Sequence, residues 1–209
     1  MEDRSLKFDI GRKGIPGRTA GLLRDIARDE FKKYLKYKRF IRGEAEKSNA
    51  VFEREKLFEE ILALPDLKTK NSSFKKRPNN QEATVAAIFY EQLGKGMFGN
   101  FVPYTSGYRD KYDLTGRFND RNLVIEFKFN LTGLFNDFTI ARKLFDEMNV
   151  LVLWEITEED RRKSEDRGID IEVIDDDDDE RIFPLSQYRL EIDSVAPVEV
   201  VEISKLIVS

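Results

Sequence analysis

Two seven-residue segments near the middle of the chain, 112–118 and 123–129, alternate between apolar and polar side chains. Successive side chains of a strand point to opposite faces, so this period of two predicts two half-buried strands. The polar face of the first segment carries Asp113, and that of the second carries Glu126 and Lys128. The pattern predicts a sheet with one face against a core and with Asp113, Glu126 and Lys128 among the ionisable groups on the other.

The linker between these segments, residues 119–122, predicts a hairpin. Pairing the residues that flank the linker places Asp113 opposite Lys128 and diagonal to Glu126. Diagonal partners lie roughly 7–8 Å apart at the backbone. Carboxylates reaching inward from that spacing can share one ion, whose bonds to oxygen are about 2.0–2.1 Å for Mg²⁺.

The chain contains no histidine and no cysteine. This excludes Ser–His triads, histidine or thiolate metal sites and cysteine nucleophiles. Hydrolysis would therefore rest on carboxylates, lysine and an oxygen-preferring metal such as Mg²⁺. A bound metal lowers the pKa of its water, and Lys128 can orient that water or stabilise the transition state.

Residues 79–93 predict a helix that ends at Gly94. Glu82 lies on the apolar stripe of this helix, which should pack on the sheet, so Glu82 is expected to supply a third carboxylate. The alternative is a capping box, in which Asn79 caps the helix and Glu82 is its reciprocal partner. Glu91 lies on another face and is expected to be solvated.

The remaining pattern predicts a mixed α/β (α+β) fold, with a mixed β-sheet flanked by helices and an N-terminal helical arm. Residues 21–64 read as helix with a break near Gly43, and 150–156 form an apolar run typical of a central buried strand that includes Trp154. The acidic run 175–180 is expected to be a solvated loop. The other expected elements are strands at 98–104, 188–192 and 198–203, a helix at 139–148 and a short terminal helix.

Asp113, twelve intervening residues and then Glu126-Phe127-Lys128 on a hydrophobic strand resemble the motif of the PD-(D/E)xK nuclease superfamily. The namesake proline is replaced by Tyr112. The resemblance implies a restriction-endonuclease-like fold over residues 71–209, with Asp113, Glu126 and Glu82 as metal ligands and Lys128 as a catalytic residue. It implies an Mg²⁺-dependent endodeoxyribonuclease, with Mn²⁺ as a substitute, acting in restriction, defence or repair.

Two structural alternatives stand beside this interpretation. Asp113 and Lys128 could form a cross-strand salt bridge on a solvated sheet face, where such pairs contribute only about 0.2–1 kcal/mol. Glu126 would then be an ordinary surface residue. Tyr104, Ser106 and Tyr108 could line a substrate groove or simply pack in a loop.

Charge is divided unevenly along the chain. Residues 1–80 carry 21 Lys and Arg against 13 Asp and Glu, whereas 81–209 carry 15 against 27. A basic helical arm and linker over 1–70, with the residues that follow it, could lie against nucleic-acid phosphates, or it could be a solvated helical surface. The residues expected to contact phosphate are Lys32, Lys33, Lys36, Lys38, Arg39, Lys75, Lys76 and Arg77.

A looser resemblance concerns the segment from Phe8 to Arg18 and the basic helix after it. It is similar to the segment that joins ATPase and nuclease parts in bacterial MORC-type and related GHKL ATPases. The resemblance implies a GHKL-type ATPase domain or subunit as a partner, beside DNA and a second copy of the chain.

The second functional hypothesis is a non-catalytic DNA-binding and dimerisation module of such an ATPase complex. No apolar run long enough for a membrane span and no signal segment is visible, so a cytoplasmic protein without membrane association is expected.

Overall fold

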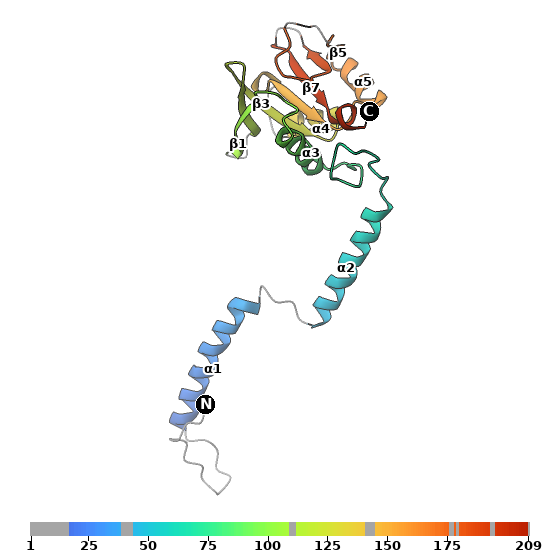
Figure 1. Cartoon of the computed structure of the whole chain (residues 1–209). Helices are drawn as coiled ribbons and strands as arrows, with labels where there is room; N and C mark the ends of the chain where they lie inside the picture. The colour runs from blue at the N-terminus through green and yellow to red at the C-terminus, as the bar shows by residue number, and fades with distance from the viewer. Residues whose placement is uncertain are drawn as a thin grey trace. The chain divides into compact units, whose positions relative to one another are not determined.

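The computed structural model describes residues 17–38, 44–108, 112–140, 145–175, 178, 180–192 and 195–208. Side chains are described for these residues except at 17, 36–38, 44–51, 108 and 137–140. The chain divides into two compact units, Met1–Ile61 and Leu62–Ser209 (Figure 1).

In its described residues, the first unit consists of two helices, α1 (Gly17–Lys38) and α2 (Glu44–Ala63). The last two residues of α2 belong to the second unit. Large apolar side chains on both helices are exposed to solvent. The helices expected at 21–64 are therefore present. The resemblance of residues 8–18 to an ATPase–nuclease connector falls almost wholly on residues outside those described.

A seven-stranded mixed sheet with flanking helices forms the second unit, in the strand order β1-β2-β3-β4-β7-β6-β5 (Figure 1). The first three strands form an antiparallel meander, β4 is parallel to both β3 and β7, and β6 and β5 complete the sheet in antiparallel pairing. The strands are β1 (Val102–Tyr108), β2 (Tyr112–Phe118), β3 (Arg121–Lys128), β4 (Val150–Leu153), β5 (Asp170–Val173), β6 (Tyr188–Glu191) and β7 (Val198–Glu202). The helices are α3 (Glu82–Gly94), α4 (Leu131–Ile140), α5 (Glu158–Glu165) and α6 (Ile203–Ile207), with a 3₁₀ turn, η1 (Phe145–Glu147).

The two faces of the central strand β4 belong to different apolar layers. Val150 and Val152 pack in a core with α3 and α6, whereas Leu151 and Leu153 pack in a core with α4. All four residues of β4 are buried, which confirms the central strand predicted from the apolar run. Trp154, 2% exposed, lies in the first of these cores, as expected.

The hairpin between β2 and β3 differs in register from the prediction. Phe118 pairs with Arg121 across a two-residue turn, Asn119-Asp120, and Leu114 pairs with Ile125. Both turn residues have positive φ, 45° and 65°, as a type I′ turn requires. Because Asn and Asp tolerate this backbone, the turn is shorter than the predicted four-residue linker, and every pair shifts by two residues.

Several element boundaries also differ from expectation. Of the helix predicted at 139–148, only residues 139–140 belong to α4, and 145–147 form η1. Helix α4 begins earlier because Asn130 Oδ1 accepts the Gly133 N–H at 2.9 Å and so caps it. The strand predicted from residue 98 begins at Val102, and Phe98 instead packs on the ring of Phe89 at 4.5 Å between centroids. Helix α5 and strand β5 were not predicted.

Candidate active site

Lys128 and Glu82 meet at the C-terminal end of β3. Lys128 is the last residue of β3, and its side chain is only 5% exposed. Its Nζ lies 3.2 Å from Oε2 of Glu82, whose side chain is 47% exposed. The site thus joins residues 46 positions apart in sequence.

Glu82 reaches this position as the first residue of α3. The residue preceding the helix is Gln81, whose side chain makes no capping hydrogen bond. The capping box considered for Asn79 and Glu82 is therefore wrong. A carboxylate in the first turn also suits the positive end of the helix dipole.

Gly133, in the first turn of α4, lies against both charged residues. A Cβ placed there would be 3.7 Å from Lys128 Cδ and 3.8 Å from Glu82 Oε1. These are ordinary van der Waals distances, so the glycine is not required sterically. The contact brings the ends of β3, α3 and α4 together around the ion pair.

Asp113 bridges β2 and β3 through its side chain. Its Oδ2 accepts the backbone N–H of Phe127 at 2.8 Å. The observed register, continued one pair beyond Leu114, sets Asp113 opposite Glu126 rather than opposite Lys128. The predicted pairing of Asp113 with Lys128 is therefore wrong, because the tight turn moves the register. Asp113 and Glu126, which were predicted to be diagonal neighbours, are instead directly opposite each other in this register.

Glu126 and Lys128 are both buried, at 2% and 4% exposure. They follow Val124 on one face of β3, and their parallel partners on β4 are Leu151 and Leu153. This burial rules out the solvated sheet face considered as an alternative. A buried carboxylate and ammonium are costly unless they are paired, and the Lys128 ammonium is paired with Glu82.

A cavity of about 270 Å³ is lined by Glu82 and Asp113, whereas Glu126 and Lys128 are not among its lining residues. Tyr90 donates to Ser106 Oγ at 3.0 Å, and Ser106 donates to the backbone oxygen of Asp113 at 2.9 Å. This chain of hydrogen bonds links α3, β1 and β2 along the cavity wall. Among the residues that line it are Glu82, Ala86, Tyr90, Ser106, Asp113 and Phe127.

Of the three aromatic and hydroxyl residues expected near a groove, only Ser106 lines this cavity among the residues with described side chains. Tyr104 is 58% exposed and lines a separate hollow with Arg117. The side chain of Tyr108 lies outside the described part.

The cavity offers carboxylate oxygens, the ligand type that hard cations prefer. In the described part of the chain, no three Asp or Glu side chains converge as ligands of one ion. Glu82 and Asp113 nevertheless line one cavity, and Mg²⁺ is commonly held by one or two carboxylates together with water and substrate phosphates. Carboxylate oxygens from these two residues therefore fit Mg²⁺ or Mn²⁺.

The lysines and arginines expected to contact phosphate have different environments. Lys32 and Lys33 form exposed ion pairs with Asp29 and Glu30 at 3.9 and 2.7 Å. Arg39 and the side chains of Lys36 and Lys38 lie outside the described residues. Lys75 and Arg77 are exposed.

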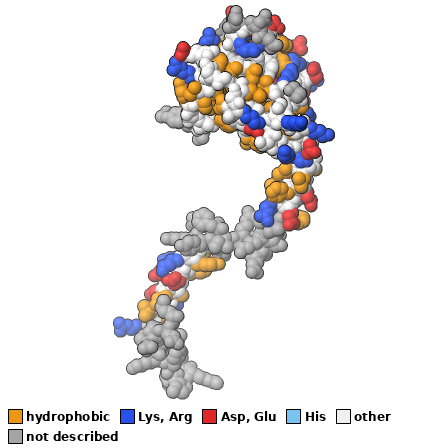
Figure 2. Space-filling model, in the orientation of Figure 1, with side chains coloured by type: hydrophobic (Ala, Val, Ile, Leu, Met, Phe, Trp, Pro, Cys, Tyr) orange, Lys and Arg blue, Asp and Glu red, His pale blue; other side chains and the backbone are white. Residues whose placement is uncertain are grey.

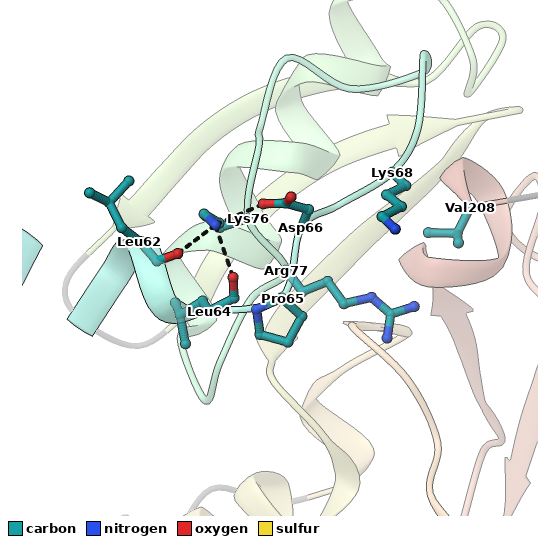
Figure 3. A pocket seen from close by; sticks show the side chains of 8 residues that line it. All are labelled: Leu62, Leu64, Pro65, Asp66, Lys68, Lys76, Arg77 and Val208. Carbon is teal, nitrogen blue, oxygen red and sulfur yellow. Dashed lines mark hydrogen bonds and ion pairs between the residues drawn. The ribbon is translucent and has the colours of Figure 1, made fainter. Parts of the chain in front are cut away.

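Lys76 is held in place by three acceptors. Its Nζ donates to the backbone oxygens of Leu62 and Leu64 at 2.7 and 3.0 Å and to Asp66 Oδ1 at 2.7 Å (Figure 3). An ammonium has three N–H donors, so all of them are engaged. The lysine thereby binds carbonyls at the C-terminal end of α2.

A second cavity, of about 650 Å³, surrounds this lysine (Figure 3). Lys68 and Arg77 also line it, and their side chains extend along its wall. Since Lys76 is engaged, these two cations are the ones available for an anion here.

Glu91 is held in a network that the sequence pattern did not reveal. Its carboxylate accepts hydrogen bonds from Ser72, Ser73 and Lys95, at distances between 2.6 and 3.0 Å. Burial raises the pKa of Glu91, but these hydrogen bonds outweigh that effect and lower its pKa to about 2. The expectation that Glu91 is solvated is wrong.

Two further buried carboxylates were also missed. Asp160 is fully buried, and it accepts from the backbone and hydroxyl of both Thr132 and Thr157, at 2.7–3.0 Å. Glu199 is buried, and its carboxylate lies 3.4 Å from Arg189. Arg189 also pairs with Asp178 of the acidic run, at 3.2 Å. The acidic run, expected to be a solvated loop, is therefore held at Asp178 by an ion pair.

No helix in the described ranges is both long enough and apolar enough to cross a bilayer. Comparison of the chain with protein-family models, with curated proteins and with solved structures gave no match in any of the three. The functional assignment consequently rests on the geometry of the site.

Proposed function

We propose that residues 71–209 form an Mg²⁺-dependent endonuclease of restriction-endonuclease-like fold that hydrolyses phosphodiester bonds in DNA. The proposal is supported by the succession of α3, three antiparallel strands, α4 and a parallel fourth strand. It is also supported by the placement of Asp113, Glu126 and Lys128 at one end of the β2–β3 hairpin.

One observation carries the proposal. Glu82 and Asp113 line a common cavity, while the buried Lys128 is bonded to Glu82 at its edge. Two carboxylates at one cavity, with an ammonium bonded to one of them, are groups that phosphodiester hydrolysis can use when histidine and cysteine are absent.

The residues have separable roles in this proposal. Glu82 and Asp113 would hold the cation, and Glu126, opposite Asp113, would add negative charge beside them. When bound, Mg²⁺ supplies an acidified water and neutralises charge on the phosphate. Lys128 would place its ammonium next to the phosphate oxygens, where a fixed cation favours the more negative transition state.

DNA would be held by cations outside this site. Lys68, Lys75 and Arg77 are exposed on the second unit, and exposed cations of this kind contact phosphate without reading sequence. Cutting of this type would serve restriction, defence or repair, alone or with a GHKL-type ATPase partner.

The second candidate is a non-catalytic DNA-binding module. It is favoured by the ion pair of Lys128 with Glu82, which already partners the ammonium, and by the lack of a three-carboxylate cluster in the described ranges. Such a module would bind DNA with strong salt dependence but would leave it intact.

A plasmid-nicking assay separates the two candidates. Supercoiled DNA would be incubated with the full chain in Mg²⁺, in Mn²⁺ and in EDTA, using the wild type, Asp113→Asn and the control Asp170→Asn. The nuclease proposal expects cutting with either metal, none in EDTA, a loss of 100-fold or more in Asp113→Asn and full activity in the control, since Asp170 is exposed on β5. Salt-sensitive binding with no cutting in any condition would contradict the proposal and support the module.

A further inference from the structure

Helices α1 and α2 expose an unusual amount of large apolar surface. Leu22, Phe31 and Tyr34 on α1 are 56–58% exposed, and Phe52 and Phe58 on α2 are 68% and 56% exposed. Figure 2 shows hydrophobic atoms at the surface along both helices. Most helical stability in proteins comes from packing of an apolar face, and monomeric proteins rarely leave large apolar patches uncovered.

The apolar arc of α1 is wider than one neighbouring helix can cover. At 100° per residue, the exposed residues from Leu22 and Ile26 through Tyr34 to Phe31 and Leu35 span roughly 220° of the helix circumference. A stripe of about 100° is enough for packing on a single surface. Helix α1 therefore needs at least two neighbours.

Helix α2 has the same property. Its exposed apolar residues Leu57, Phe58, Leu62 and Phe52 also span roughly 220° of its circumference. A hairpin of α1 on α2 within one chain would give each helix one neighbour, and much of both arcs would stay in water.

The two helices also carry opposite net charges. Helix α1 has seven Lys and Arg against three Asp and Glu, and α2 has six Asp and Glu against three Lys and Arg. Their lengths are similar, 22 and 20 residues. A basic and an acidic helix of matched length attract each other, whereas two like helices repel.

We propose that α1 and α2 of two copies of this chain assemble into a dimeric four-helix bundle, in which each basic helix lies between acidic ones. Two copies supply two neighbours for every helix, which is the number that the apolar arcs require. This inference does not depend on the proposed nuclease activity.

The oligomeric state tests the proposal directly. Sedimentation equilibrium of the full chain, from low micromolar to about 100 µM, should give twice the 24.4 kDa chain mass. Ile26→Lys places a charge in the apolar arc and should weaken dimerisation 100-fold or more. The control is its neighbour Asp25→Lys, on the polar arc, where Asp25 is 66% exposed and makes only an i,i+3 pair with Arg28.

The control separates packing from charge. Asp25→Lys changes the net charge by two and Ile26→Lys by one, so a purely electrostatic effect would be larger in the control. Lysine has high helix propensity, so neither change should break α1 by itself. The only tryptophan, Trp154, is buried in the second unit, and its fluorescence reports whether that unit remains folded in each variant.

Helix content supplies a second readout. Because the bundle would stabilise both helices, circular dichroism at 222 nm should fall on dilution of the wild type and at all concentrations in Ile26→Lys, with Trp154 emission unchanged. A chain that remains monomeric at 100 µM, or a dimer that Ile26→Lys and Asp25→Lys affect equally, would overturn the proposal.

Discussion

The ammonium of Lys128, buried at the end of β3, lies 3.2 Å from the half-exposed carboxylate of Glu82 at the start of α3. The pair is asymmetric, because Glu82 can be hydrated when its partner is lost whereas Lys128 cannot. Removing the lysine charge therefore leaves, at Glu82, a carboxylate that water can still reach, and we expect activity to fall more than stability.

Lys128→Met tests this asymmetry. Methionine keeps the apolar stem of lysine inside the buried layer, so we expect the free energy of unfolding in urea to change by less than about 1 kcal/mol. Nicking in Mg²⁺ should fall by about 100- to 1000-fold if Lys128 stabilises the transition state. Lys70→Met, at an exposed position away from the cavity, serves as the control. Equal loss of stability and activity in Lys128→Met would assign the lysine a structural role only.

Glu91 predicts a specific acid sensitivity. Its pKa in the folded chain is about 2, below the ordinary value of 4.5, so the folded state favours the charged form. That stabilisation is fully present above about pH 4.5 and is lost as the pH falls toward 2. At pH 7, Glu91→Gln should lower the free energy of unfolding by about 2 kcal/mol, allowing for partial solvent exposure.

The pH dependence distinguishes the charge of Glu91 from its packing. The difference between wild type and Glu91→Gln, measured by urea unfolding, should shrink between pH 4.5 and the lowest pH at which the chain remains folded. Glu172→Gln, on exposed β5, should show no such change. If the difference in unfolding free energy between wild type and Glu91→Gln stayed constant with pH, the glutamine amide would be failing to fit the site for steric reasons. The stability of the network would then not depend on ionisation of Glu91.

The strands and their faces could be predicted from local pattern, but the register could not. Alternation in 112–118 and 123–129 is a property of each strand alone, but the predicted half-burial is wrong for β3, because residues 125–128 are buried on both of its faces. Register depends on the turn, where Asn119 and Asp120 both take positive φ. A two-residue turn and a four-residue linker are both compatible with the letters Asn-Asp-Arg-Asn, and only the first sets Asp113 opposite Glu126.

Elements stabilised by tertiary polar contacts were the ones missed. Helix α5 has no apolar residue in Glu158–Glu165, so it gives no helical stripe. Its start is formed by the capping box of Thr157 and Asp160, and Asp160 is also bonded to Thr132 at the start of α4. Likewise, Glu91 accepts hydrogen bonds from serines about nineteen positions away, a distance at which a single sequence carries no signal.

Gly116 and Gly133 should respond to alanine in opposite ways. A Cβ on Gly116 would lie 2.5 Å from the ring of Phe101 and 2.7 Å from the backbone oxygen of Val102, so β1 and β2 would have to separate. We expect Gly116→Ala to destabilise the chain by about 2 kcal/mol or more. Gly133→Ala meets only ordinary contacts within α4 and should stabilise the helix by about 0.5–1 kcal/mol. Thermal unfolding of both variants measures the contrast, and a neutral Gly116→Ala would contradict the tight packing of β1 on β2.

Asp160 should be a sensitive carboxylate for folding of the second unit. It is fully buried and its two oxygens accept four hydrogen bonds, two from the first turn of α4 and two from the start of α5. Asp160→Ala leaves the backbone N–H groups of Thr132 and Thr157 unsatisfied away from water, which should cost about 3–4 kcal/mol. Asp170→Ala, on the exposed edge of the same unit, should cost less than about 0.5 kcal/mol. Urea unfolding followed by Trp154 fluorescence compares the two variants.

Helix α4 begins beside Lys128 and Glu82, so Asp160→Ala should also loosen the candidate site before the sheet unfolds. Amide hydrogen exchange in this variant should then be faster in the first turn of α4 than in β4. Equal protection of both elements would show that α4 is held by its apolar face alone.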